Sequence, residues 1–150
     1  MTEDWVDLLA ALQAEGARFL VVGAHALAVH GVTRATQDID VWVDPSDENA
    51  ERVWRALLAF GAPLAELGIG LDDLTRPETV IQIGLPPNRV DILTSITGVS
   101  EFADAWRDRL DSDVDRMVMP FLGRETLIRN KRSTGRLKDL ADVEALGRAE

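Results

Sequence analysis

The sequence predicts an α/β protein in which a small mixed β-sheet is flanked by helices, in a single domain spanning residues 1–150. Three observations support this fold class. Short apolar runs alternate with amphipathic stretches at helical spacing, and glycine or proline residues separate them. The length suits one compact domain, and no repeat, linker or biased tract divides it.

The first half of the chain predicts helices and strands in alternation. Trp5, Leu8 and Leu12 share one face of a first helix that ends near Gly16, and a buried strand then meets a short helix at Gly23. After a second strand, Pro45 and Ser46 open a helix that carries one apolar stripe and stops at Gly61. The expected ranges are 3–15, 18–23, 24–30, 38–44 and 45–61.

The second half begins with a loop over 63–77, which has little periodicity and room for one helical turn. An antiparallel hairpin follows, joined around 85–88. A helix from Ser100, a strand and two C-terminal helices, which together cover about 123–148, complete the chain. The expected ranges are 79–84, 89–94, 100–110, 114–120, 124–131 and 136–146. The apolar residues of the last two helices are expected to pack on the sheet: Leu127, Ile128, Leu137, Leu140 and Ala141.

The formal net charge of −10 argues against a general nucleic-acid coat protein, because non-specific binding depends on neutralising phosphates with Lys and Arg. The charge is nevertheless uneven along the chain. Six basic residues and the single acid Glu125 lie between Gly123 and Lys138. A local anion site in this segment is therefore compatible with the acidic composition.

The absence of cysteine excludes disulfides and thiolate metal sites, and no apolar run approaches the roughly 20 residues that span a bilayer. The start of the chain is acidic and lacks the basic region and apolar core of a signal peptide. We therefore expect a cytoplasmic protein without membrane partners.

Asp38 and Asp40 are the first candidate site residues. Alternate residues of a strand share a face, so the two carboxylates project together while Ile39 and Val41 fill the other side. At roughly 5 Å and an effective dielectric of about 20 their repulsion is about 3 kcal/mol. Such a pair favours a hard cation such as Mg²⁺, which commonly binds substrate phosphates as well. Gly23, at the preceding strand-to-helix turn, permits close approach of the backbone to an anion.

The order of these motifs resembles that of the DNA polymerase β-like nucleotidyltransferase superfamily. The pattern of this superfamily begins with an apolar residue, Gly, and Gly or Ser. After a gap it continues with Asp-apolar-Asp-apolar, and a third acid follows on a later strand. In this chain the three parts correspond to residues 22–24, residues 38–41 and Asp91. Within the superfamily the chain looks closest to small bacterial proteins related to the abortive-infection nucleotidyltransferase toxins. The residues that carry this closer resemblance are His30, Gly31, Arg34, Thr36 and the segments 130–132 and 135–140.

The resemblance implies the minimal nucleotidyltransferase fold and a metal-dependent enzyme. Such an enzyme moves a nucleoside monophosphate from an NTP, for example ATP, to a hydroxyl acceptor and releases pyrophosphate. It also implies that Asp38 and Asp40 hold Mg²⁺, and that Asp91 joins a second metal or deprotonates the acceptor. The residues expected to bind nucleotide or phosphate are Gly23, Ala24, Arg34, Lys131, Arg136 and Lys138. Relatives of this kind modify RNA ends or tRNA, proteins or small molecules, and the toxin group implies an antitoxin partner; a homodimer is a further possibility.

Several alternatives stay open. Ala24 stands where the family has Gly or Ser, so the chain is alternatively a catalytically silent nucleotide-binding or toxin–antitoxin interaction module. Asp91 is alternatively a surface strand residue or the simple ion-pair partner of Arg89. The Asp-x-Asp spacing recurs in 111–115, which we interpret as a solvated turn leading into a strand, because it lacks the glycine and glutamate of a calcium loop. His25 and His30 lie about 140° apart on a helix and predict no zinc site.

Overall fold

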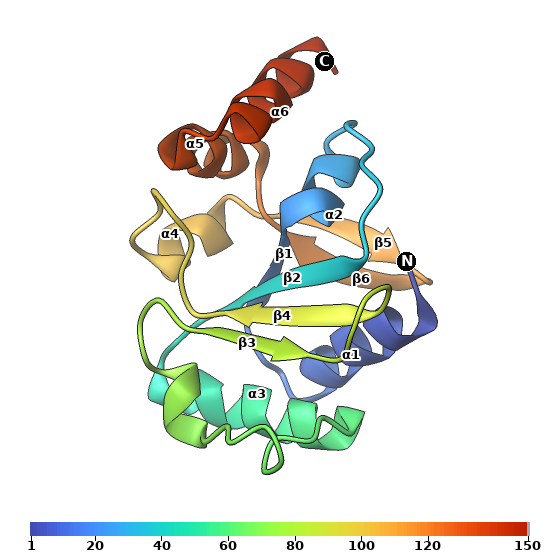
Figure 1. Ribbon diagram of the computed structural model, residues 1–150, viewed down its shortest axis with the longest axis vertical. Helices are drawn as coiled ribbons and strands as arrows, with labels where there is room; N and C mark the ends of the chain where they lie inside the picture. The colour runs from blue at the N-terminus through green and yellow to red at the C-terminus, as the bar shows by residue number, and fades with distance from the viewer. Residues whose placement is uncertain (150) are drawn as a thin grey trace.

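The computed structural model describes residues 1–149, which form one six-stranded mixed sheet with helices on both faces (Figure 1). The strands are β1 (Phe19–Val22), β2 (Asp38–Val43), β3 (Val80–Ile83), β4 (Arg89–Leu93), β5 (Leu110–Val114) and β6 (Met117–Phe121). The helices are α1 (Glu3–Ala14), α2 (Gly23–Val29), α3 (Asp47–Phe60), the short 3₁₀ turn η1 (Leu71–Leu74), α4 (Phe102–Arg107), α5 (Arg124–Thr134) and α6 (Leu137–Arg148). The predicted fold class is confirmed.

The strand order is β3-β4-β2-β1-β6-β5, so the two hairpins form the edges of the sheet. β2 pairs with β4 and β1 with β6 in parallel, whereas the pairs β1–β2, β3–β4 and β5–β6 are antiparallel. The strand of Asp91 therefore lies directly beside the strand of Asp38 and Asp40, as the candidate site requires.

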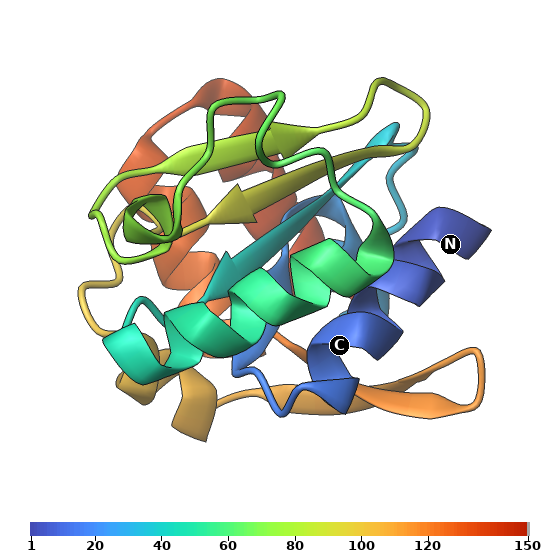
Figure 2. The same cartoon turned by 90° about the horizontal axis from the view of Figure 1, so that it is seen from below.

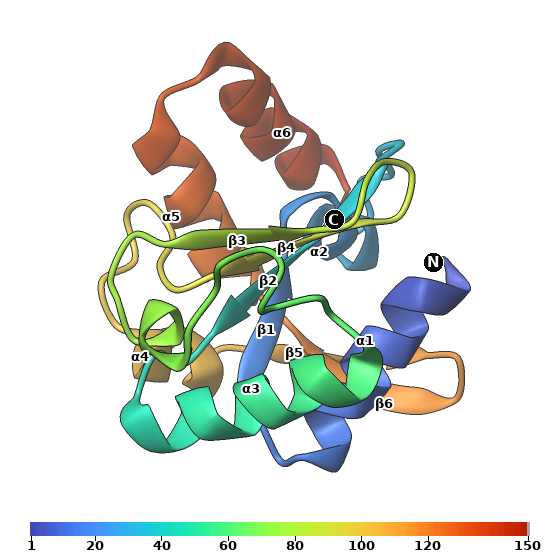
Figure 3. The same cartoon turned by 60° about the horizontal axis from the view of Figure 1, so that its bottom comes forward.

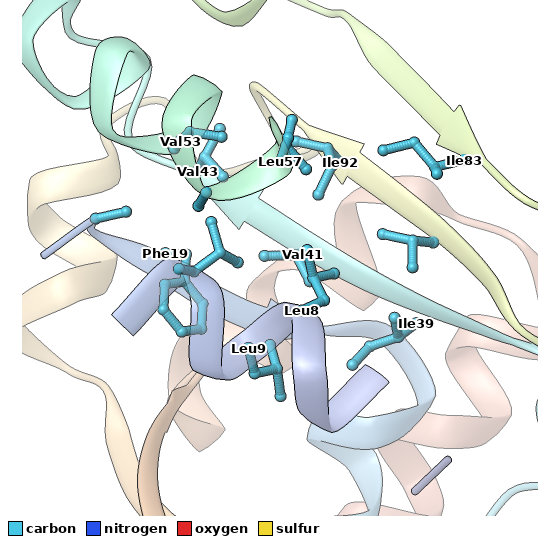
Figure 4. Packing of buried hydrophobic residues seen from close by; sticks show 14 of the residues in the cluster. Leu8, Leu9, Phe19, Ile39, Val41, Val43, Val53, Leu57, Ile83 and Ile92 are labelled. Atoms are coloured by element: carbon cyan, nitrogen blue, oxygen red, sulfur yellow. The ribbon is translucent and has the colours of Figure 1, made fainter. Parts of the chain in front are cut away.

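One face of the sheet packs on α1 and α3, which run side by side below it (Figure 2). The alternation of each strand sends one set of apolar side chains to this face. Figure 4 shows Val41 and Val43 from β2 packed against Leu8 from α1 and Leu57 from α3. All four side chains are fully buried. This layer holds the largest apolar cluster in the described chain and fixes the register of β2.

The opposite face carries α2, α4, α5 and α6 (Figure 3). Its apolar cluster includes Leu20, Trp42, Phe102 and Leu146. Trp42 lies on the same strand face as the aspartates, but it is buried at 2% exposure, with its ring centroid 5.0 Å from that of Phe102. This face of the sheet therefore carries an apolar cluster in one part and the aspartates of the candidate site in the other.

Five features differ from the sequence-based expectation. Residues 110–114 form the edge strand β5 instead of a turn, because all five residues pair with β6 across a tight turn at Asp115 and Arg116. Helix α4 is shorter than expected and follows Glu101 without a side-chain cap from Ser100. Helix α5 continues to Thr134, and β6 begins later than 114.

The fifth difference concerns α6. Leu127 is buried and Ile128 is partly buried, but Leu137 is 86% exposed, Leu140 is 42% exposed and Ala141 is exposed, so these last three do not pack on the sheet. Helix α6 is instead held by Leu146 and by a buried ion cluster described below. None of the helices in residues 1–149 is long and apolar enough to cross a membrane.

Candidate active site

Three carboxylates converge on the open half of the sheet. Asp40 of β2 is the register partner of Asp91 on β4, and Asp38 lies two residues before Asp40 on the same face. One carboxylate oxygen from each residue lies within 4.8 Å of the others. Asp91 is 8% exposed, whereas Asp38 and Asp40 are half-buried. The predicted triad is therefore assembled by strand pairing alone.

The three like charges strongly affect one another. Burial, followed by the charges of Asp38 and Asp91, raises the pKa of Asp40 to about 7. Burial also raises the pKa of Asp91, although the Arg89 guanidinium partly opposes the shift. Without a further cation the site therefore resists holding three ionised carboxylates at neutral pH.

Arg89 was considered from the sequence only as an ion-pair partner of Asp91, and the structure places it between two members of the triad. Its Nη2 donates to Asp38 Oδ2 at 2.7 Å and to Asp91 Oδ2 at 3.3 Å, and its Nε lies 3.2 Å from Asp91 Oδ1. The sequence indicated this contact through spacing, because Arg89 and Asp91 are two residues apart on one strand and therefore lie on the same face. The expected ion pair exists, but it includes Asp38 as well.

The donor set fits a hard divalent cation. All three groups offer carboxylate oxygens, which Mg²⁺ prefers. Oδ1 of Asp91 is buried and accepts no hydrogen bond within residues 1–149, although the Nε of Arg89 lies near it. A buried carboxylate oxygen with free lone pairs, next to two further carboxylates, is the arrangement expected of a metal ligand.

Gly23 is fixed by its contact with the triad. Its φ of +67° is in the left-handed region, and a Cβ atom added there would come within 2.5 Å of Asp40 Oδ2. The turn between β1 and α2 therefore packs its backbone directly against the carboxylate of Asp40. Ala24 follows at the start of α2, and both residues line the cleft described next.

Asp38 is oriented by neighbours on the loop before β2. Thr36 donates its hydroxyl to the carbonyl oxygen of Asp38 at 2.9 Å and to Asp38 Oδ1 at 3.1 Å. His25 Nε2 lies 3.3 Å from the same carbonyl oxygen, with its ring edge-on to Trp5. His30 bonds instead to the carbonyl of Leu122, so the two histidines do not meet at a metal site.

A cleft of about 1040 Å³ extends from the carboxylates to α5 and α6. One wall carries Asp38 and Asp40 together with the Gly23 turn. The wall formed by α5 and α6 contains Lys131, Arg136 and Lys138, and Arg34 comes from the loop before β2, so every basic residue predicted to bind phosphate lines the cleft. The same helices also contribute the acids Asp139 and Asp142, and further lining residues include 77–80 and 95–100. The structure thus brings the predicted site residues to one cleft, with Asp91 just behind its wall.

Most of the basic residues already have acidic partners. Lys131 is 8% exposed, and its Nζ donates to Asp139 at 3.0 Å and to Asp142 at 3.1 Å. Arg34 donates to Asp142 at 3.0 Å, and Arg136 donates to Asp139 at 2.7 Å. Three cations share two carboxylates, so this ion cluster keeps a positive excess toward the cleft.

The ion cluster is strongly bonded. Burial opposes ionisation of Asp139, but hydrogen bonds from Thr134, Lys131 and Arg136 outweigh it and lower the pKa of Asp139 to about 2. Lys138 differs from the other three cations, because it is exposed and forms no ion pair or hydrogen bond within residues 1–149. It is the basic residue of the cleft with the greatest freedom to meet a ligand.

No family model matches the chain, and a search of curated proteins finds no significant relative. The similar solved structures include the following two. The protein TM1012 of Thermotoga maritima, provisionally described as a nucleotidyltransferase, is 18% identical, with a TM-score of 0.60 over 96% of this chain and 88% of the other. The lincosamide antibiotic adenylyltransferase LnuA, solved with lincomycin bound, is 12% identical, with a TM-score of 0.61 over 100% of this chain and 98% of the other.

At such identities the likeness is one of fold, and it covers nearly the whole of each chain. The two structures do not bear on the narrower resemblance to abortive-infection toxins, which stays a prediction. The chain shares the fold of these two proteins, whose descriptions are those of a nucleotidyltransferase and an adenylyltransferase.

Proposed function

We propose that the protein is a metal-dependent nucleotidyltransferase, which moves a nucleoside monophosphate from an NTP to a hydroxyl acceptor. The observation that carries this proposal is the convergence of three carboxylates beside a cleft that also has a basic wall on α5 and α6: Asp38 and Asp40 line the cleft, and Asp91 lies just behind them. A complex of a divalent cation and a triphosphate has charges of both signs, so it complements both walls. The shared fold with two proteins described as transferring nucleotides supports the same reading.

Asp38 and Asp40 would hold Mg²⁺ on the triphosphate, and Asp91 would complete this site or a second one. Bound Mg²⁺ supplies charge stabilisation of the attacking and leaving oxygens of an in-line displacement. In that displacement the acceptor oxygen forms a bond to the α-phosphorus, and the bond from the α-phosphorus to pyrophosphate breaks. The hydroxyl proton would pass to the carboxylate of Asp91, whose pKa is raised by burial, which makes it a stronger base than an exposed carboxylate.

The phosphates would lie between the Gly23 turn and the basic wall. The backbone of Gly23 and Ala24 approaches the cleft without a side-chain hydroxyl, so Ala24 contributes its amide only. Lys138 is free to reach the leaving pyrophosphate, and Arg136 lies at the α5–α6 turn beside it. Lys131 and Arg34 would act mainly by holding α6 in place and by adding positive potential, since both are already paired.

The proposal leaves three acceptor classes: RNA or tRNA, a protein and a small molecule. LnuA is described as acting on a lincosamide antibiotic, which favours a small molecule, whereas the resemblance to toxins favours RNA and an antitoxin partner. A homodimer would supply additional acceptor surface to so short a chain. Each class presents a hydroxyl group and would use the same carboxylates.

The test is to incubate the protein with each α-labelled NTP, Mg²⁺ and acceptors of all three classes, and to measure pyrophosphate release and label transfer. Asp40→Asn should abolish both. Asp113→Asn is the matched control, because Asp113 belongs to the second Asp-x-Asp of the chain and is exposed on β5, away from the cleft. Transfer that survives Asp40→Asn would refute the mechanism. Binding of NTP without any transfer would establish the silent nucleotide-binding module instead.

A further inference from the structure

We propose that the β3 edge of the sheet binds the acceptor, which is a small hydroxylated molecule carrying an amine. Gln82 orients its hydroxyl group toward Asp91, and Glu78 receives its ammonium group. The proposal rests on the proposed function, since it assigns the acceptor side of the same site. It follows from the strand order, from two polar side chains without partners and from the charge of the cleft rim.

The strand order gives the site two distinct sides. Gly23 follows β1, the triad lies on β2 and β4, and β3 is the free edge beyond them. The attacking and leaving oxygens of an in-line displacement lie on opposite sides of the phosphorus. With the triphosphate toward the Gly23 turn, the acceptor must approach from the side of Asp91 and β3.

Gln82 stands next to Asp91 on this approach. It is the register partner of Asp91, so one row across four strands contains Gln82, Asp91, Asp40 and Val22. Directly paired residues point to the same face, with Cβ atoms about 4.5–5.5 Å apart. Gln82 is exposed, and its side chain makes no hydrogen bond within residues 1–149. Its amide both donates and accepts, as the recognition of a hydroxyl group requires.

Glu78 lies at the other end of the same edge. It is the only charged residue of the cleft-lining segment 77–80, and its φ of +53° is unusual for a glutamate. Its backbone N–H donates to Ser95 Oγ at 3.2 Å, which helps to hold this conformation. The carboxylate is exposed and has no ion pair within the described chain. Strained backbone that presents an unpaired charge to a cleft favours a ligand-binding role.

The spacing of the two residues sets the size of the acceptor. Glu78 and Gln82 are four positions apart, which at about 3.3 Å per residue is at most about 13 Å. A molecule with two linked rings spans this distance between a hydroxyl group and an amine. An RNA acceptor would meet an unpaired carboxylate at the rim of a chain with a net charge of −10, which opposes phosphate binding.

The experiment supplies α-labelled NTP and Mg²⁺ with four acceptors: lincomycin, a glucosamine disaccharide, the neutral polyol sorbitol and a short RNA oligonucleotide. We expect label on an amine-bearing acceptor. Gln82→Ala should lower kcat/KM for that acceptor at least tenfold without changing the KM for NTP. Glu78→Gln should raise the acceptor KM severalfold with little change in kcat. The exposed edge-strand variant Asp113→Asn should change neither value.

Each other result has a defined meaning. Label on RNA or sorbitol in preference to the amines, or full activity of Gln82→Ala, would overturn the acceptor assignment. Pyrophosphate release with label on none of the four would also overturn it, while leaving the nucleotidyl-transfer chemistry intact. The absence of pyrophosphate release under every condition would instead refute the proposed function. Thermal unfolding of each variant separates these results from loss of the fold.

Discussion

The α-carbon of Gly23 lies against the carboxylate of Asp40, so that a methyl group at Gly23 would come within 2.5 Å of Asp40 Oδ2. Glycine is therefore required at position 23 for two reasons: its backbone has a positive φ, and a side chain would collide with Asp40. The contact joins the turn that is proposed to meet phosphate with the carboxylate that is proposed to meet metal. A single substitution should disturb both.

Gly23→Ala should destabilise the protein by about 2–4 kcal/mol, the sum of left-handed strain and a forced displacement of Asp40. It should also weaken Mn²⁺ binding, measured by titration calorimetry. Gly68→Ala is the matched control, because Gly68 has a φ of +70° and nothing within 4 Å of an added Cβ. We expect only about 1–2 kcal/mol there and unchanged Mn²⁺ affinity. Equal losses of stability and of Mn²⁺ affinity in the two variants would contradict the contact.

The metal-free protein should lose stability as the pH rises from 5 to about 7. The folded-state pKa of Asp40 is raised to about 7, so the folded protein holds a proton that the unfolded chain has released above its ordinary value near 3.8. Stability from this group is fully present below pH 3.8 and is lost as the pH passes through 7. Asp91, whose pKa is also raised, acts in the same direction.

The check is the urea midpoint in EDTA between pH 5 and 8, for the wild type and for Asp40→Asn. The variant should be more stable than the wild type at pH 8 and should show a flatter profile. Saturating Mg²⁺ should abolish or reverse the decline, because metal binding favours the ionised carboxylates. A wild-type profile that rises over this range in EDTA would show that the triad does not carry the expected repulsion.

Arg89→Gln should destabilise the metal-free protein by about 1–3 kcal/mol, since it removes hydrogen bonds to two carboxylates that also repel each other. Added Mn²⁺ should restore more stability to this variant than to the wild type, measured as the shift in Tm. Arg55→Gln is the control, because it breaks an ion pair with Glu15 on the surface instead. Equal Mn²⁺ shifts in Arg89→Gln and the wild type would argue against a neutralising role for Arg89.

Asp139→Asn should cost about 3–5 kcal/mol, because it leaves the buried Lys131 with one carboxylate partner fewer. In the wild-type protein the pKa of Asp139 is about 2. The stability that ionised Asp139 contributes should therefore be lost as the pH falls from about 4 to 2, well below the range in which Asp40 titrates. The surface variant Glu48→Gln, which breaks an i,i+4 pair with Arg52, should cost about 0.5 kcal/mol or less. Denaturant unfolding at pH 7 measures both.

The alternation of apolar and polar residues was sufficient to predict the face of Asp38 and Asp40 and the strand of Asp91. Their convergence could be expected only from the resemblance, because strand order depends on pairing between distant segments. Residues 110–114 were not recognised as a strand because their acids suit a turn equally well, and an exposed edge strand has no buried face to impose alternation.

The partners of charged side chains were the least predictable part of the site. Lys131 was expected to be available to phosphate, but it is buried between Asp139 and Asp142 from the following helix. Spacing along α5 gives no indication of this, since the contact depends on how α6 folds back after Gly135. Leu137 and Leu140 have helical spacing suited to packing, yet they face away from the sheet for the same reason.

The basic wall has a consequence for how fast a ligand arrives. Segment 123–138 has six basic residues and one acid, a charge of +5, so the rest of the chain carries −15 to give the total of −10. The charge is therefore distributed unevenly, and the positive segment lies on α5 and the first turn of α6 (Figure 3). The field of such a distribution repels anions from most of the surface and steers them to the cleft, and the association rate then falls as salt screens it beyond about 8–10 Å.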